Sequence, residues 1–199
     1  MSAREEILSR VRAALDGVPA DPTPVVAPRG RPPEDVVALF AERVADYRAE
    51  VIRCTPADLA TTVRAALPDG TVVVPGGLSL ELPGAVVDGA AGSWLSAARL
   101  DDVAAVVTDA RVGIAETGTI VLDHGPGQGR RVISLIPDVH VCIVRAEQVV
   151  PDVPDAIALL DPSRPLTWIS GPSATSDIEL DRVEGVHGPR TLRVVLVGA

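Results

Sequence analysis

Apolar residues follow two spacings along the chain, and the change between them predicts where helices and strands lie. The first helical pattern opens on Ser2 and Glu5, which form a capping box. A second helix is expected over Glu34–Glu50. The apolar faces of these two helices are Ile7, Leu8, Val11 and Leu15, and Val37, Phe40, Val44 and Tyr47. Six prolines lie between them, within residues 18–33, and predict a semi-rigid linker.

Farther along, short apolar runs alternate with turns and helical patterns. Further helices are predicted from Thr55 to Leu67, over Pro151–Leu160 and within Ser173–Val183. The strand-like runs are Val51–Cys54, Thr71–Val74, Val103–Thr108, Val112–Ala115, Thr119–Leu122, Val132–Ile136, Val139–Val144, Thr167–Ile169 and Leu192–Val197. This order predicts an α/β fold, an open and mostly parallel sheet with helices on both faces. Residues 1–33 form an N-terminal helical extension with its Pro-rich linker, and residues 34–199 form the α/β domain.

Composition narrows the chemistry that the chain can perform. Hydrophobic residues make up 47% of it and aromatic residues only 2%, so the core must consist of aliphatic side chains. The net charge is −9, and all 18 basic residues are arginine. Without lysine there is no Schiff-base amine and no P-loop lysine. The acidic balance and the lack of stacking aromatics argue against a nucleic-acid partner.

The cysteines and the N-terminus bear on compartment and cofactors. Cys54 and Cys142 form neither a disulfide framework nor a metal-spaced pair. The first fifteen residues are charged rather than signal-like, and no apolar stretch is long enough to cross a bilayer. We therefore expect a cytoplasmic protein without a membrane span and without a metal site. His140 and Cys142 share one face of a strand, but core filling is the favoured interpretation.

Four segments contain more glycine, hydroxyl and charged residues than packing requires: Pro75–Gly77, Gly113–Thr119, Ser170–Glu179 and Gly185–Arg190. Ligands of open α/β sheets bind beyond the carboxyl ends of the strands, so the segments are expected to converge at one rim of the sheet in one polar cavity. The expected ligand-binding residues are Gly76, Gly77, Thr117, Gly118, Thr119, Ser170, Gly171, Ser173, Thr175, Asp177, Gly188 and Arg190. Their ligand would be a small molecule with a carboxylate or phosphate group.

Two titratable residues in these segments are candidates for catalysis. Glu116 can act as a nucleophile or general base if it is partly desolvated. His187 titrates near neutral pH. The alternative for Glu116 is a polar residue in a turn, and for His187 a hydrogen-bonded loop residue.

Taken in order, four motifs resemble the LUD-domain family, in the C-component branch of its lactate-utilization proteins. They are AETGTIVL at 115–122, RRVISLIPDVHVCIV at 130–144, SGPSATSDIE at 170–179 and GVHGPRTL at 185–192. The resemblance covers most of the chain from about Glu34 onward. It implies a fold similar to the NagB/RpiA/CoA-transferase group, which includes sugar isomerases. It also implies a role beside two iron–sulfur partner proteins that oxidise L-lactate to pyruvate.

The resemblance leaves two classes of function open. In the first, the chain is a ligand-binding or accessory subunit, and the iron–sulfur clusters belong to its partners, so the chain itself binds no cofactor. In the second, it is a stand-alone CoA-transferase-like enzyme with Glu116 as the catalytic carboxylate, which rests on fold-level analogy. A folate cyclo-ligase-like enzyme is less attractive because lysine is missing. Whether the chain forms a homo-oligomer is left open.

Overall fold

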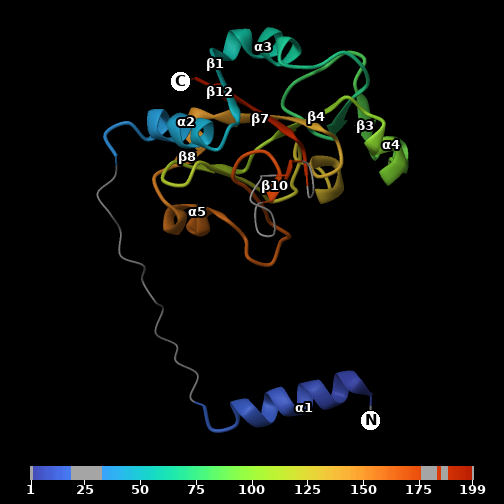
Figure 1. Cartoon of the computed structure of the whole chain (residues 1–199), viewed down its shortest axis with the longest axis vertical. Coiled ribbons are helices and arrows are strands. Elements are labelled where there is room, and N and C mark those ends of the chain that lie inside the picture. The colour runs from blue at the N-terminus through green and yellow to red at the C-terminus, as the bar shows by residue number, and fades with distance from the viewer. Residues whose placement is uncertain (1, 19–32, 176–182, 185–187, 199) are drawn as a thin grey trace.

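The centre of the molecule is a six-stranded sheet, seen in a computed structural model that describes residues 2–18, 33–175, 183–184 and 188–198 (Figure 1). Every pair of neighbouring strands in it is parallel. In spatial order the strands are β1 (Glu50–Cys54), β12 (Thr191–Val197), β7 (Val139–Arg145), β4 (Ala105–Asp109), β2 (Val72–Pro75) and β3 (Val86–Asp88). The predicted open parallel sheet is therefore confirmed.

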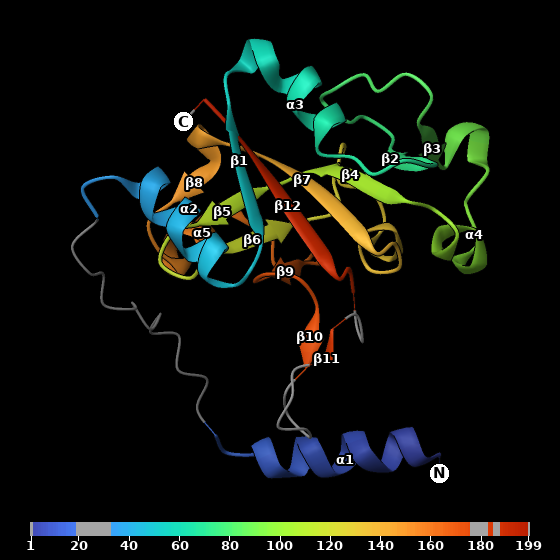
Figure 2. The ribbon, with the colours of Figure 1, turned by 45° about the horizontal axis from the view of Figure 1, so that its top comes forward.

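A second, smaller sheet packs on one face of the first (Figure 2). Its strands, in spatial order, are β8 (Val149–Val150), β5 (Val112–Ile114), β6 (Thr119–Leu122) and β9 (Thr167–Ile169). β6 runs antiparallel to both of its neighbours, whereas β8 pairs with β5 in parallel. A two-stranded ribbon, β10 (Ala174–Thr175) with β11 (Val183–Glu184), follows in the chain.

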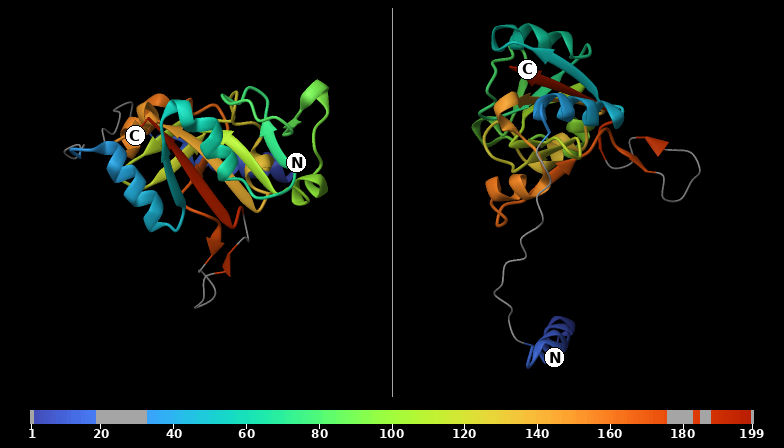
Figure 3. Two further views of the ribbon diagram at one scale, coloured as in Figure 1. Left: turned by 90° about the horizontal axis from the view of Figure 1, so that it is seen from above. Right: turned by 90° about the vertical axis from the view of Figure 1, so that its left-hand side faces the viewer.

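Helices cover both faces of the large sheet, as the apolar pattern predicts. On one face α3 (Leu59–Ala65) places Leu59 and Val63 in a buried cluster with Val141. On the other face α2 (Val36–Asp46) buries Phe40 and Val44 between the two sheets. Two shorter helices, α4 (Ala97–Asp101) and α5 (Val153–Leu159), lie at the periphery (Figure 3). Successive side chains of each strand point to opposite faces of the sheet, and an apolar layer covers each face.

The N-terminal helix α1 (Ala3–Leu15) begins with the predicted capping box between Ser2 and Glu5. None of its residues is buried, and Figure 1 draws it outside the α/β body. Ile7, Val11 and Leu15 are about half exposed or more on its apolar face. Among the described residues, no helix combines the length and the apolar character that crossing a bilayer requires.

The structure corrects two local predictions and adds elements that the sequence did not reveal. Residues 131–134 form a 3-10 helix instead of a strand, and its Ile133 packs in a buried cluster with Val73, Leu100 and Val106. The second helix ends at Asp46, before Arg48 takes a left-handed backbone conformation with φ 66°. In the segment 173–183, where a helix was expected, Ala174–Thr175 and Val183–Glu184 are strands, while residues 176–182 lie outside the described residues, so a helix there stays a prediction. β3 and α4 were not predicted, because their apolar runs are only two or three residues long.

Candidate functional site

The four predicted segments do not converge at one rim of the sheet, and this expectation is corrected. Gly113–Thr119 contains the turn between two antiparallel strands, β5 and β6. Ser170 follows β9, which also belongs to the small antiparallel sheet, and Gly188 precedes β12. The rule for carboxyl ends of parallel strands therefore applies to Gly76 and Gly77 alone, after β2. As a result, some of the predicted residues lie near the amino ends of the large sheet's strands and others near the carboxyl ends.

The first polar cavity lies at the amino ends of β7 and β12, and we call it the amino-edge cavity. Its volume is about 320 Å³, at the lower end of the roughly 300–1,000 Å³ typical of small-molecule sites. It is lined by Arg131, Ser134, Leu135, His140, Thr167, Trp168, Ile169, Ser170, Gly171, Pro172, Ser173, Gly188, Pro189 and Leu192. Four of the residues predicted to bind ligand are therefore brought together here.

A chain of hydroxyl groups stands behind one wall of the amino-edge cavity. The Thr119 hydroxyl lies 2.8 Å from that of Thr117 and 2.8 Å from that of Ser170. Across the mouth, the Ser173 amide donates to the Pro189 carbonyl at 2.8 Å, which ties the two loops together. The geometry thus joins three sequence-predicted hydroxyl residues into one hydrogen-bonded unit.

A buried histidine forms the floor of the same cavity. The Nε2 atom of His140 lies 2.8 Å from the Thr108 hydroxyl, which also donates to Cys142 Sγ at 3.7 Å. Thr108 thus links the imidazole ring to the sulfur atom of Cys142. Burial lowers the pKa of His140 to about 4 and raises the pKa of Cys142 to about 12. The imidazole is therefore neutral and the thiol is not a nucleophile near pH 7.

Two predicted glycines have a packing role that the sequence does not reveal. A Cβ added to Gly118, where φ is +58°, would lie 2.6 Å from the Arg43 carbonyl carbon of α2. A Cβ on Gly171, where φ is +84°, would lie 2.7 Å from Tyr47 Cβ. Both glycines let the small sheet approach the C-terminal end of α2 closely.

The remaining predicted residues lie outside both cavities or outside the described residues. Glu116 is exposed in the turn between β5 and β6, and its backbone amide donates to the Pro151 carbonyl. Arg190 is exposed and pairs with Asp138 at 3.6 Å. Asp177, His187 and the Thr175 side chain lie outside the described residues, so the roles expected of them stay predictions.

The second cavity, the carboxyl-edge cavity, was not found from the sequence. Its volume is about 510 Å³, and it lies where β4 and β7 end in Asp109 and Arg145. It is lined by Ser79, Asp109, Ala110, Arg111, Asp123, Gly125, Pro126, Gln128, Arg145, Gln148, Leu159, Asp161 and Arg164. Charged residues that end two apolar strand runs were the signal that could have indicated it.

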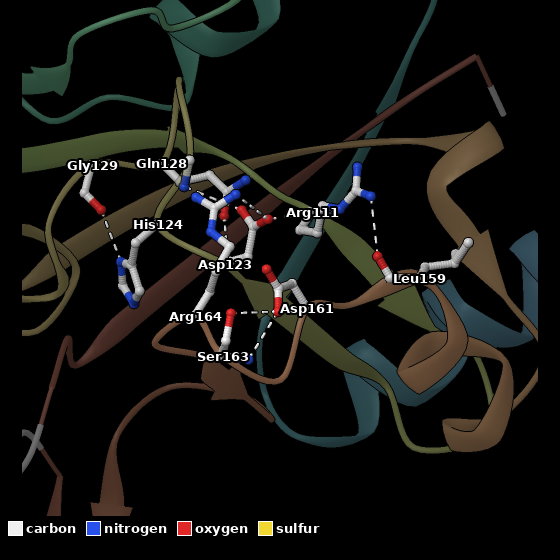
Figure 4. Close-up of polar contacts among 10 residues, drawn as sticks. Arg111, Asp123, His124, Gln128, Gly129, Leu159, Asp161, Ser163 and Arg164 are labelled. Carbon is white, nitrogen blue, oxygen red and sulfur yellow. Dashed lines mark hydrogen bonds and ion pairs between the residues drawn. The ribbon is translucent and has the colours of Figure 1, made fainter.

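In this cavity the Asp123 carboxylate lies between two arginine side chains (Figure 4). The Asp123 carboxylate lies 3.3 Å from Arg164 Nη1 and 3.8 Å from Arg111 Nε. Its other oxygen accepts from the Gly125 amide at 3.1 Å. The Asp123 amide in turn donates to Gln128 Oε1, so the loop after β6 holds this carboxylate in place.

A third hollow, of about 610 Å³, is lined by Gly76 and adjoins the carboxyl-edge cavity through Asp123 and Arg164. At its far side Arg130 binds the buried Asp88 carboxylate through Nε at 2.6 Å and Nη2 at 2.9 Å. Burial opposes the charge on Asp88, but the hydrogen bonds from Arg130 and the Leu95 amide outweigh it and lower the pKa of Asp88. This pair anchors the loop after β3.

Fold and cavities together define an α/β protein with a polar cavity at each end of the strands of one parallel sheet. The sequence profile of the LUD domain matches residues 96–197. The chain is 43% identical to lactate utilization protein C of Deinococcus radiodurans, across 98% of this chain and 96% of that one. It therefore belongs to the LUD-domain family.

Two further comparisons agree with that assignment. Lactate utilization protein C of Bacillus subtilis is 36% identical over 100 residues, which cover 46% of this chain and 41% of that protein. The crystal structure of a DUF162 family protein from Deinococcus radiodurans superposes with a TM-score of 0.70 at 38% identity. That match covers 86% of this chain and all of the other, so the fold is shared over nearly the whole body.

Proposed function

We propose that this chain is a subunit of a lactate-utilization system that supports oxidation of L-lactate to pyruvate. The observation that carries the proposal is its near full-length similarity to lactate utilization protein C of Deinococcus radiodurans. An iron–sulfur cluster takes about four cysteine ligands, and this chain contains two cysteines. Electron transfer therefore belongs to iron–sulfur partner proteins, and the chain acts as an accessory or ligand-binding component.

The ligand of this subunit is a small carboxylate in the amino-edge cavity. Arg131 supplies a guanidinium for the carboxylate, and the Ser170 hydroxyl and the neutral His140 ring supply polar contacts for a hydroxyl or keto oxygen. Leu135 and Leu192 provide an apolar wall for a methyl group. L-Lactate and pyruvate carry this combination of groups, and both fit within about 320 Å³.

Binding can be tested through Trp168, which lines the cavity and is partly exposed. In a Trp94→Phe background Trp168 is the only tryptophan, so a fluorescence titration with L-lactate or pyruvate reports on this cavity. Arg131→Gln is expected to weaken the response about tenfold or more, since it removes a charged hydrogen bond. Arg99→Gln on α4, which lies outside the cavities, is the charge-matched control. Equal effects of the two substitutions would contradict the proposed site.

The role as a subunit needs a separate test, because ligand binding alone does not establish it. We expect the tagged chain to co-purify with an iron–sulfur protein from cells grown on lactate. Glu116→Gln should restore growth on lactate to a deletion strain, since Glu116 is exposed and lines neither cavity. Failure of that variant to restore growth, with normal protein levels, would favour the stand-alone enzyme with a catalytic glutamate.

A further inference from the structure

We propose that the carboxyl-edge cavity is a second binding site, and that it takes a ligand with a phosphate or diphosphate group. Three arginines from three segments of the chain line it: Arg111 beside β5, Arg145 at the end of β7, and Arg164 after α5. This goes beyond the proposed function, because both the cavity and the class of ligand differ from those at the amino edge.

The carboxylates of the cavity are already engaged in holding its loops. Asp109 accepts from the Ser79 amide at 2.8 Å and from the Ser79 hydroxyl at 2.6 Å. Asp161 accepts from the amide and the hydroxyl of Ser163 at 2.9 and 2.7 Å. Asp123 accepts from the Gly125 amide and faces two arginines. Each of these three carboxylates therefore already accepts at least one hydrogen bond from the protein itself.

The arginines, in contrast, retain donors for a ligand. A guanidinium has five N–H groups. Within the described part of the chain, Arg111 donates to the Leu159 carbonyl at 3.1 Å, and Arg145 donates to the Ser79 hydroxyl at 3.0 Å. Arg164 has its ion pair with Asp123 at 3.3 Å. These one or two contacts per guanidinium leave the cavity rich in donors, so its ligand must be rich in acceptors.

The Gln148 side chain fixes the backbone at or beside two of these arginines. The Arg145 amide donates to Gln148 Oε1 at 2.9 Å, and Gln148 Nε2 donates to the carbonyl of Ala110, the residue before Arg111. This link fixes the end of β7 against the start of β5. An anion can thus be bound without first ordering the two segments, which lowers the cost of binding.

Phosphate suits this arrangement better than a single carboxylate. A carboxylate is planar and is matched by one guanidinium, whereas a phosphoryl group presents three oxygens in a tetrahedral array to donors from several directions. The volume of about 510 Å³ also exceeds that of lactate or pyruvate several-fold and leaves room for the organic part of a phosphorylated molecule. The combination indicates an organic phosphate or diphosphate.

Isothermal titration calorimetry of the full chain with inorganic pyrophosphate, at low ionic strength, tests the site. We expect saturable binding at one site, and about tenfold or greater weakening in Arg145→Gln and in Arg164→Gln. Arg164→Gln should disturb the folded structure little, since Asp123 keeps Arg111 as an ion-pair partner. The charge-matched control is again Arg99→Gln, which should stay within about twofold because Arg99 lies outside the cavity and exposed charges are screened.

Three results would overturn the inference. The first is the absence of saturable pyrophosphate binding, and the second is equal weakening by Arg99→Gln, which would indicate unspecific attraction. The third is displacement of bound pyrophosphate by an equal concentration of L-lactate, which would show that the carboxyl-edge cavity prefers a simple carboxylate. Ser170→Ala, at the other edge of the sheet, should leave pyrophosphate binding unchanged. Loss of the lactate signal without loss of pyrophosphate binding, or the reverse, separates failure of the proposed function from failure of this inference.

Discussion

The buried His140 ring makes the stability of this protein dependent on pH in a calculable way. Burial lowers the pKa of His140 from its usual 6.5 to about 4, so the folded state disfavours the proton that the unfolded chain accepts. Between these two values the unfolded state binds more protons than the folded state. Stability contributed by the neutral ring is therefore complete above pH 6.5 and is lost as pH falls toward 4.

The size of the loss follows from the two pKa values. With 6.5 in the unfolded chain and about 4 in the folded one, the free energy of unfolding falls by about 1.4 kcal/mol near pH 5.5 and by about 2.5 kcal/mol near pH 4.5. Carboxylates contribute little change above about pH 5.5, since most titrate near pH 4. Between about pH 7.5 and 5.5, His140 therefore accounts for most of the change in the free energy of unfolding.

Urea unfolding of the native chain and of His140→Gln, at several pH values, isolates this contribution. Glutamine can hydrogen-bond the Thr108 hydroxyl but does not titrate. The stability difference between the two proteins should narrow by about 1.4 kcal/mol from pH 7.5 to 5.5. A difference that stays constant within about 0.3 kcal/mol would refute the burial argument. If the variant does not fold, the NMR titration of His140 in the native chain replaces it, and protonation above pH 6 would be the refuting result.

Three further predictions concern packing and reactivity. Asp88→Asn should lower the free energy of unfolding in urea by about 3 kcal/mol, because it removes the buried negative charge that pairs with the bidentate Arg130. Gly118→Ala should cost about 3 kcal/mol, against about 1 kcal/mol for Gly84→Ala, because both positions have positive φ but only Gly118 abuts α2. A thiol-reactive dye should label Cys54 and spare Cys142 in the native protein, since burial raises the pKa of Cys142 to about 12; equal rates would contradict this.

The parallel sheet was predictable because its strands are uninterrupted apolar runs. Val139–Val144 and Leu192–Val197 are covered on both faces, so no polar alternation is needed and the pattern identifies them as buried strands. The pairing of the shorter runs was not predictable. Nothing in Thr119–Leu122 or Thr167–Ile169 reveals that they pair with each other in an antiparallel sheet rather than joining the large one.

Because the pairing of these short strands could not be predicted, residues expected at one end of the sheet lie at both ends. Ser170 was expected at the carboxyl rim of the large sheet because it follows a strand, but the strand belongs to the other sheet. The carboxyl-edge cavity combines Arg111, Arg145 and Arg164, whose separation along the chain conceals their proximity. Each is unremarkable alone in a chain whose only cations are arginines. Their shared cavity is a property of the tertiary fold.

Both cavities are built on the same central strand, β7. His140 near its beginning contacts one cavity and Arg145 at its end contacts the other, about 16 Å away by the rise of an extended chain. Deleting or inserting one residue between them would reverse the facing of the strand residues on one side of the change. Aliphatic side chains there would face the wrong layer, and one of the two polar ends would turn away from its cavity. Length variation among relatives is therefore expected in the surface loops and not within these seven residues.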